Sequence, residues 1–217
     1  MSFKTKKYQV IQEALSKELS TFIFNYMLLQ RNAVDFLLKT HQLKRANFFT
    51  GQRVDEMMPG IYSKYSDWVM ETLLLYMKPI MKEKTGMDLV PTYSYTRLYE
   101  KGNILPRHKD RGSCEVSTTV HLGGDSWPFF LDPSGKGSRV EKKGEVIYTP
   151  ANLKGVQIDL EAGDMLIYSA CELEHWREPF KGNVCSQVFL HYNQADSPLA
   201  QINRFDKRSM LGLPRHT

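Results

Sequence analysis

The feature that most constrains how this chain can fold is a change in hydrophobic period near residue 90 of its 217 residues. Apolar residues in the segment 16–38 recur at intervals of three and four, which predicts an amphipathic helix with Ser16 as its N-cap. A second helix is predicted over 66–86, with Gly86 as its C-terminal stop and Pro79 as a point of bending. The first part of the chain is therefore expected to be helical.

After residue 90 the period falls to two, which is typical of β-strands. Short stretches rich in β-branched and aromatic residues alternate with turn signals such as "GGD" and "EAGD". The predicted strands are 92–99, 117–122, 128–131, 145–149, 156–160, 165–169 and 187–193. This pattern predicts an α+β fold, in which the N-terminal helices pack on a sandwich or jelly roll. We expect residues 1–90 to form a helical support region and residues 91–217 the β-core, within one structural domain.

Charge and cysteine content limit the binding partners and the cellular compartment that we expect for the protein. The net charge is +5 and the isoelectric point is about 9.0, but no dense lysine and arginine block is present, so a nucleic-acid partner is not expected. Cys114, Cys171 and Cys185 have no CxxC spacing, which fits free thiols in a reducing compartment. No signal peptide is recognisable, and the apolar stretch 22–29 is too short to cross a bilayer. We therefore expect a cytoplasmic protein with no membrane partner.

Two potential metal ligands, His108 and Asp110, are separated by one residue. On an extended segment such residues point to the same side and can converge on one ion. His175, which follows the predicted strand 165–169, is the best third ligand, because two histidines and one carboxylate on one face of iron leave three positions free. The alternative is a surface loop in which Asp110 pairs with Arg107 or Arg111. An isolated HxD pattern favours that alternative.

The context of the HxD pattern changes this balance. The stretches "RLYEKGNILPRHKD", "STTVHL", "GDMLIYS" and "HWREPFKG" follow one another between about residues 90 and 195. Together they resemble the core of the iron(II)/2-oxoglutarate-dependent dioxygenases, and most of all the prolyl 4-hydroxylase-like group, some members of which occur in marine phages. The helical N-terminal third is also similar to that group. Motif and context together favour the metal site.

The resemblance implies a double-stranded β-helix (jelly-roll) catalytic core with the N-terminal helices packed on its major sheet. It also implies that His108, Asp110 and His175 bind Fe(II) as the catalytic ligands, and that 2-oxoglutarate and dioxygen are cosubstrates, with ascorbate helping to keep the iron reduced. The implied activity is hydroxylation of a prolyl or other residue of a protein or peptide, coupled to decarboxylation of 2-oxoglutarate to succinate.

The chain departs from the resemblance where the cosubstrate is usually anchored. A basic residue is expected nine or ten places after the second histidine, but Val184 and Cys185 stand there. The distal carboxylate still needs a charged partner, because its burial alone would cost several kcal/mol. The replacements are, in order of preference, Arg97 and Tyr99, then His121, with Lys181 and Arg177 as further basic residues.

Each of these residues has a simpler alternative role. Arg97 can pair with Glu100 or another carboxylate on the sheet surface. Tyr99 is as well suited to packing as to a binding wall. His121 fits a hydrogen-bonded core histidine and a site residue equally.

The sequence leaves the substrate open. The resemblance favours a protein or peptide partner, while oxidation of a free amino acid or other small molecule and demethylation of nucleic acid are alternatives within the enzymes. A non-catalytic, cupin-like metal-binding jelly roll is the alternative from another class, although that class tends to use three histidines and a glutamate. The sequence is silent on oligomeric state.

Overall fold

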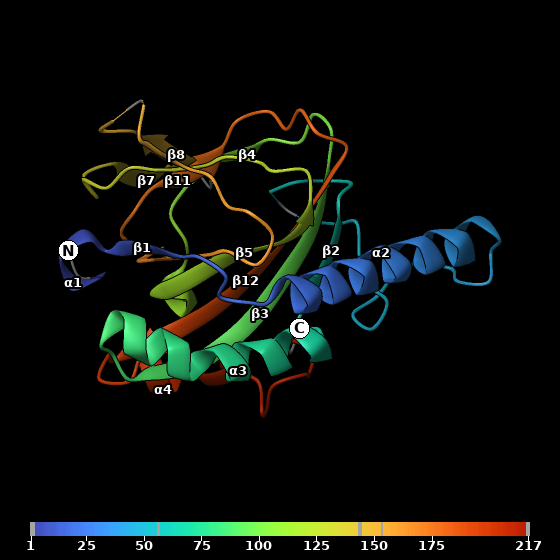
Figure 1. Ribbon diagram of the computed structural model, residues 1–217, viewed down its shortest axis with the longest axis horizontal. Helices are drawn as coiled ribbons and strands as arrows, with labels where there is room; N and C mark the ends of the chain where they lie inside the picture. Colours follow the sequence, from blue (N-terminus) through green and yellow to red (C-terminus); the bar gives the residue numbers. More distant parts are fainter. Residues whose placement is uncertain (1–2, 56, 143–144, 153, 216–217) are drawn as a thin grey trace.

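The computed structural model describes residues 3–55, 57–142, 145–152 and 154–215, which form two antiparallel sheets, a hairpin and several helices (Figure 1). The six-stranded sheet has the order β1 (Tyr8–Ile11), β10 (Met165–Tyr168), β5 (Val116–Gly124), β12 (Val184–Gln194), β3 (Leu89–Glu100), β2 (Tyr62–Tyr65). The four-stranded sheet has the order β4 (Leu105–His108), β11 (His175–Arg177), β6 (Phe129–Leu131), β9 (Val156–Ile158). The hairpin consists of β7 (Ser138–Lys142) and β8 (Glu145–Thr149).

Both predicted helices are confirmed, and local signals set their ends. In α2 (Lys17–Lys39) the Ser16 side chain accepts a hydrogen bond from the amide of Leu19, and in α3 (Trp68–Thr85) Asp67 caps the first turn in the same way. Gly86 ends α3 in the left-handed conformation at φ 69°. Two further helices, α1 (Phe3–Lys6) and α4 (Leu199–Ile202), are single turns, and 3₁₀ turns lie at Gly112–Cys114 and Arg204–Lys207. Among the described residues, no helix combines the length and apolarity needed to cross a membrane.

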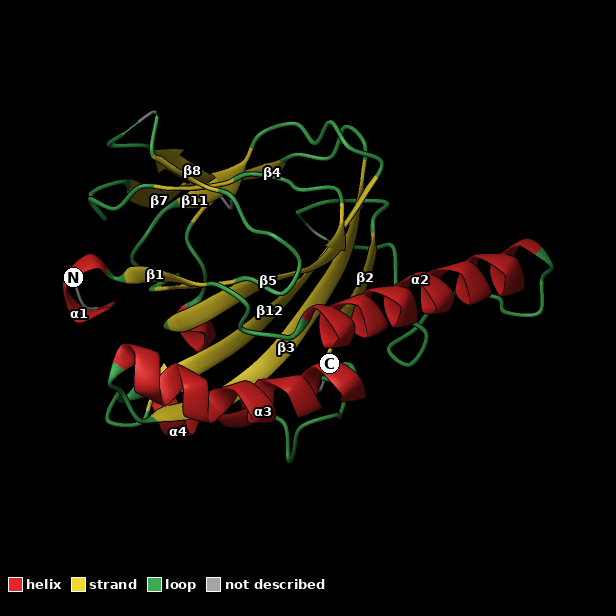
Figure 2. Ribbon diagram, viewed as in Figure 1, coloured by secondary structure: helices red, strands yellow, loops and turns green. Residues whose placement is uncertain are grey.

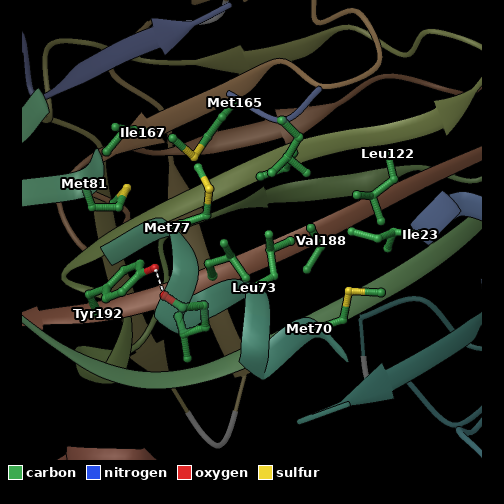
Figure 3. Packing of buried hydrophobic residues seen from close by; sticks show 14 of the residues in the cluster. Ile23, Met70, Leu73, Met77, Met81, Leu122, Met165, Ile167, Val188 and Tyr192 are labelled. Carbon is green, nitrogen blue, oxygen red and sulfur yellow. Dashed lines mark hydrogen bonds between the residues drawn. The ribbon is translucent and has the colours of Figure 1, made fainter. Parts of the chain in front are cut away.

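The main hydrophobic core lies between the long helices and one face of the six-stranded sheet (Figure 2). Met70 and Met77 of α3 are fully buried against sheet residues such as Val188 (Figure 3). The Tyr192 hydroxyl donates to the Leu74 carbonyl at 2.7 Å, so the polar end of this buried ring is satisfied inside the core. This face of the sheet is therefore fully covered.

The opposite face of the six-stranded sheet packs on the four-stranded sheet. Because side chains alternate along a strand, Leu166 and Tyr168 of β10 point to this face while Met165 and Ile167 point to the helices. Phe129 and Leu131 of β6 complete the inter-sheet cluster. Polar side chains that point into this layer are consequently shielded from bulk water on both sides.

Every strand predicted from the sequence overlaps an observed strand, but several observed strands were not predicted. Three of them, β1, β4 and β2, have four residues each, and β11 has three, so that each offers only a weak hydrophobic period. They form because a neighbouring strand offers its hydrogen-bonding edge. Since β1 and β2 come from the first 90 residues, that region contributes strands as well as helices, and the domain division at residue 90 stays a prediction.

The packing of α3 gives a stability prediction. Leu74→Ala should lower the free energy of unfolding by about 2–5 kcal/mol, because Leu74 is fully buried and its loss leaves a cavity. Leu75→Ala should change it by less than about 0.5 kcal/mol, since Leu75 is 52% exposed. Urea unfolding followed by circular dichroism measures both values. Equal losses would contradict the placement of α3 on the sheet.

Candidate metal centre

His108, Asp110 and His175 are brought together at the edge of the layer between the sheets. The antiparallel pairing of β4 with β11 places His175 directly opposite His108, and their ring centroids are 4.2 Å apart. The Oδ1 atom of Asp110 lies 3.5 Å from Nε2 of His108 and 3.6 Å from Nε2 of His175. Three potential ligand atoms from two distant stretches of the chain thus converge within 4.8 Å of one another.

Backbone carbonyls fix the orientation of both imidazoles. Nδ1 of His108 lies 2.7 Å from the Pro106 carbonyl, and Nδ1 of His175 lies 2.9 Å from the Leu173 carbonyl. A carbonyl oxygen can only accept, so each Nδ1 carries the proton and each neutral ring presents an Nε2 lone pair toward Asp110. The Asp110 amide is held in turn by the Ala170 carbonyl at 2.9 Å. The ring geometry is therefore preorganised for a metal ion.

The protonation states suit a divalent cation. Burial lowers the pKa of His108, and the neighbouring His175 acts in the same direction. Burial alone would raise the pKa of Asp110, but its interactions with the neighbouring His108 and His175 side chains outweigh burial and hold that pKa well below its usual value. His108 is therefore neutral and Asp110 ionised at neutral pH, and together with His175 they offer the two-histidine, one-carboxylate donor set that fits Fe(II) with three positions left open.

The two strands that carry the histidines are locked together on their outer face. Arg107 of β4 pairs with the buried Glu174 at 2.9 Å, and its guanidinium lies 3.4 Å from the ring centroid of Trp176. Because neighbouring residues point to opposite faces, holding Arg107 and Trp176 outside directs His108 and His175 inside. Arg107 is therefore engaged with Glu174, in contrast to the surface-loop alternative.

The side-chain carboxylate of Asp206, in the C-terminal segment, holds the residues just after the HxD pattern in place. Arg111 makes two hydrogen bonds to Asp206, at 2.7 and 2.8 Å, and Ser113 and the Tyr65 hydroxyl donate to the same carboxylate. Burial opposes the ionisation of Asp206, but the bonds from Arg111 lower its pKa to about 2. Asp206 adopts a left-handed backbone conformation, with φ 54°, to reach this position. The residues after α4 thereby fix the loop that follows Asp110.

A cavity of about 1130 Å³ opens beside the three potential ligands. Residues of both sheets, of the loop that contains Asn47 and Asp55, and of the C-terminal segment line it. Its walls are rich in tyrosine, with Tyr65, Tyr93 and Tyr95 side by side on the six-stranded sheet. This volume is slightly above the range of about 300–1,000 Å³ that is usual for ligand pockets, and it is sufficient for two small ligands or for one ligand and an extended chain.

Arg97, the favoured anchor for the cosubstrate, is already paired. Its Nε and Nη2 atoms donate to the two oxygens of Asp55 at 2.8 and 3.0 Å, and the Tyr95 hydroxyl donates to the same carboxylate. The partner expected from the sequence was Glu100 or another carboxylate on the sheet surface. Asp55 was missed because it lies 42 residues away in an irregular loop with no motif. The charge of Arg97 is neutralised inside the protein.

The other predicted cosubstrate residues lie in different environments. Tyr99 is fully buried, and its hydroxyl has no hydrogen-bond partner, although Arg97 is near enough to lower its pKa against the effect of burial. His121 is buried with Nδ1 2.9 Å from the Gln187 amide nitrogen, and burial lowers its pKa to about 4. Lys181 is exposed in the loop between β11 and β12. Arg177, the remaining candidate, is buried in β11 two residues after His175.

A second group of potential ligands, Asp110, Cys114 and His191, also comes close together. Burial raises the pKa of the Cys114 thiol well above its ordinary value, so the thiol stays protonated, and its sulfur lies 3.2 Å from the Tyr93 hydroxyl. Nδ1 of His191 lies 2.7 Å from the Ser117 hydroxyl. This group is therefore a poorer donor set than the triad.

Comparison with known proteins shows a shared fold. No protein-family model matches the chain, and no curated protein matches it by sequence. A prolyl-4-hydroxylase from Pseudomonas putida superposes with a TM-score of 0.58 at 14% identity, covering 88% of this chain and 95% of that one. AviO1 from Streptomyces viridochromogenes gives 0.60 at 15%, covering 91% and 94%.

A third solved structure adds bound ligands to the comparison. HygX from Streptomyces hygroscopicus, solved with nickel and 2-oxoglutarate, has a TM-score of 0.58 at 13% identity, covering 89% of this chain and 85% of that one. Another structure of HygX also holds hygromycin B. The resemblance to the 2-oxoglutarate oxygenases, and to prolyl hydroxylases among them, is confirmed at the level of the fold.

The geometry predicts which histidines hold a metal ion. His108→Ala and His175→Ala should each weaken Fe(II) binding by more than the roughly 10–100-fold that loss of an outer-shell partner costs. His191→Ala is the matched control and should stay within about threefold of the parent, below ~0.7 kcal/mol. Anaerobic competition against a chromophoric chelator gives the three affinities. A larger effect in His191→Ala than in His175→Ala would move the site to the second group.

Proposed function

We propose that this protein is an Fe(II)- and 2-oxoglutarate-dependent dioxygenase that hydroxylates its substrate. The observation that carries the proposal is the convergence of His108, Asp110 and His175 at a large cavity between two sheets. In this proposal the two sheets form a double-stranded β-helix and the triad binds the iron. The fold shared with solved oxygenases supports both statements.

The residues of the chain position and shield the reaction centre. When bound, Fe(II) with 2-oxoglutarate and dioxygen supplies the oxidising chemistry, which inserts one oxygen atom into a C–H bond and releases succinate and carbon dioxide. His108, Asp110 and His175 occupy one face and leave the other for the cosubstrates. The carbonyls of Pro106 and Leu173 keep both imidazoles in the ligand tautomer, so no proton has to move when the metal enters.

Aromatic rings exclude water from the buried side of the centre. Phe129 stacks on the His175 ring with centroids 5.6 Å apart, and Tyr168 meets the same ring edge-on at 4.9 Å. Both residues belong to the inter-sheet cluster and line the cavity. A dry wall at this position strengthens the electrostatic interactions of the ligands and limits unproductive reaction with solvent.

The favoured substrate is a prolyl or other residue of a protein or peptide. The likeness to a prolyl-4-hydroxylase and a cavity walled by Tyr65, Tyr93 and Tyr95, which can pack against an extended chain, support it. A small polar molecule is the second candidate. The specific observation in its favour is the likeness to HygX, which has the same TM-score as the hydroxylase and has been solved with hygromycin B.

Two further expectations belong to this proposal. Ascorbate should sustain turnover by returning oxidised iron to the ferrous state. A reducing, cytoplasmic location is consistent with Cys114, Cys171 and Cys185, which are all free thiols.

Succinate production tests the proposal. Protein reconstituted with Fe(II) should convert 2-oxoglutarate to succinate under air, even without substrate, and His108→Ala and Asp110→Ala should lower the rate by at least about 100-fold because the metal is no longer held. The control is His41→Asn, a change at an exposed left-handed position that asparagine tolerates. Folded, iron-loaded protein that neither binds 2-oxoglutarate nor consumes it would refute the oxygenase assignment.

The substrate class needs a separate measurement. Proline-containing peptides and a set of polar small molecules can be offered in parallel, and mass spectrometry then looks for the gain of one oxygen atom. A product in the peptide arm that raises the succinate rate supports the favoured substrate. A product confined to the small-molecule arm would replace it with the second candidate.

A further inference from the structure

Arg177 is a buried cation without an anionic partner. Its side chain is 1% exposed, and it is the largest of the fully buried side chains in the described part of the chain. Nη1 donates to the Trp127 carbonyl, whereas Nε and Nη2 have no hydrogen-bond partner, and no described carboxylate forms an ion pair with Arg177. An arginine guanidinium keeps its positive charge inside proteins. Burying such an isolated charge is strongly unfavourable, so the site is incomplete without an anion.

The surroundings of Arg177 offer aromatic rings and polar groups, but no carboxylate among the described residues pairs with it. The guanidinium lies between the rings of Trp127 and Phe129, 5.1 and 5.2 Å from their centroids. The unpartnered Tyr99 hydroxyl and the neutral His121 ring are close enough to interact electrostatically with it. A planar guanidinium edge and a free hydroxyl match the two oxygens of one carboxylate.

The position of Arg177 relative to the triad sets the length of the ligand. Arg177 follows His175 by two residues on β11, so both side chains point into the inter-sheet layer, about 7 Å apart along the strand. Leu105, the cross-strand partner of Arg177, and Phe129, which packs on it, both line the cavity beside the triad. A ligand that joins the metal to Arg177 therefore carries anionic groups at both ends of a short chain.

We infer that Arg177, assisted by Tyr99, binds the distal carboxylate of 2-oxoglutarate, whose keto acid end is directed to His108, Asp110 and His175; this inference rests on the proposed function. The anchor thus comes from the strand of the distal histidine itself. At Cys185, where the resemblance places a basic residue, the small side chain of β12 leaves room for the arginine of β11. The charge of Arg97 is already neutralised by Asp55, and Lys181 is exposed, so Arg177 is better suited to this role than either of them.

A pair of ligands and a pair of variants test the anchor. Binding of 2-oxoglutarate and of 2-oxopentanoate, which lacks the distal carboxylate, is measured by anaerobic calorimetry on the Fe(II)-loaded protein. The parent should prefer 2-oxoglutarate by at least about 30-fold, as expected for a buried charge pair. Arg177→Gln should reduce this preference to below about threefold by weakening only the 2-oxoglutarate affinity. Tyr99→Phe should lower the preference by a smaller factor.

Two controls separate Arg177 from its rivals. Lys181→Gln removes an exposed cation near the same strand and should leave the preference unchanged. The double variant Asp55→Asn/Arg97→Gln removes the rival ion pair without leaving either charge buried alone, and it should also keep the preference. If the double variant loses the preference and Arg177→Gln keeps it, the anchor is Arg97 and the inference is overturned.

Thermal unfolding gives a readout independent of turnover. Arg177→Met replaces the uncompensated cation with an apolar side chain of similar length, so the ligand-free variant should melt at the same temperature as the parent or above it. The rise in melting temperature that 2-oxoglutarate gives the metal-loaded parent should disappear in this variant. A ligand-free variant that melts well below the parent would show that Arg177 is satisfied within the fold and would overturn the inference.

The outcomes also separate this inference from the proposed function. Metal-loaded parent protein that binds neither ligand would refute the oxygenase assignment together with the anchor. Parent protein that binds 2-oxoglutarate with the expected preference, while Arg177→Gln and Arg177→Met retain that preference, would refute the anchor alone.

Discussion

The register between β4 and β11 is the constraint on which the rest of the site depends. It places His108 opposite His175 although 67 residues separate them in the chain, and it directs His175 and Arg177 into the layer between the sheets. A slip of one residue would turn Trp176 inward and both functional side chains outward. The candidate metal centre and the buried cation therefore both depend on the pairing of these two strands, although the register shifts between His175 and Arg177.

This register is held by residues that take no part in the chemistry. Arg107, Glu174 and Trp176 form an ion pair and a cation–π contact on the outer face of the small sheet, and Phe130 stacks on Trp176. Since adjacent residues point to opposite faces, an interaction outside fixes the direction of the ligands inside. The residues that hold the two strands together thus lie on the opposite face of the small sheet from the potential metal ligands.

Local physics accounts for the parts of the fold that the sequence predicts. Ser16, Asp67 and Gly86 mark helix ends through bonds and conformations that involve only neighbouring residues, and period-two stretches identify the longer strands. Some short strands, such as β11, were not predicted, because three or four residues give little pattern and their hydrogen bonds are completed by partners far away in sequence. The three potential metal ligands were predicted from motif order, and the structure brings them together.

The sequence alone does not show which basic residue is available to bind the cosubstrate. Arg97 and Tyr99 are two residues apart on β3 and therefore lie on one face of it, but the sequence does not reveal which cation already has a counter-ion. Asp55 reaches Arg97 from an irregular loop, whereas no described carboxylate reaches Arg177. Only the tertiary structure distinguishes a neutralised charge from an uncompensated one. The sequence does indicate, through the two-residue spacing, that Arg177 and His175 point to the same side of a strand.

The hydrogen bonds to Asp206 connect the carboxyl-terminal segment to the loop that follows Asp110. Arg111, Ser113 and Tyr65 all end on one carboxylate that belongs to a segment outside both sheets. A proteolytic nick between α4 and Asp206, or a fusion partner that pulls this segment away, would release the loop beside Asp110 while leaving the sheets intact. Purification tags on that side of the molecule are thus a design hazard, because a preparation trimmed there would keep its sheets but lose the support of the loop beside the three potential metal ligands.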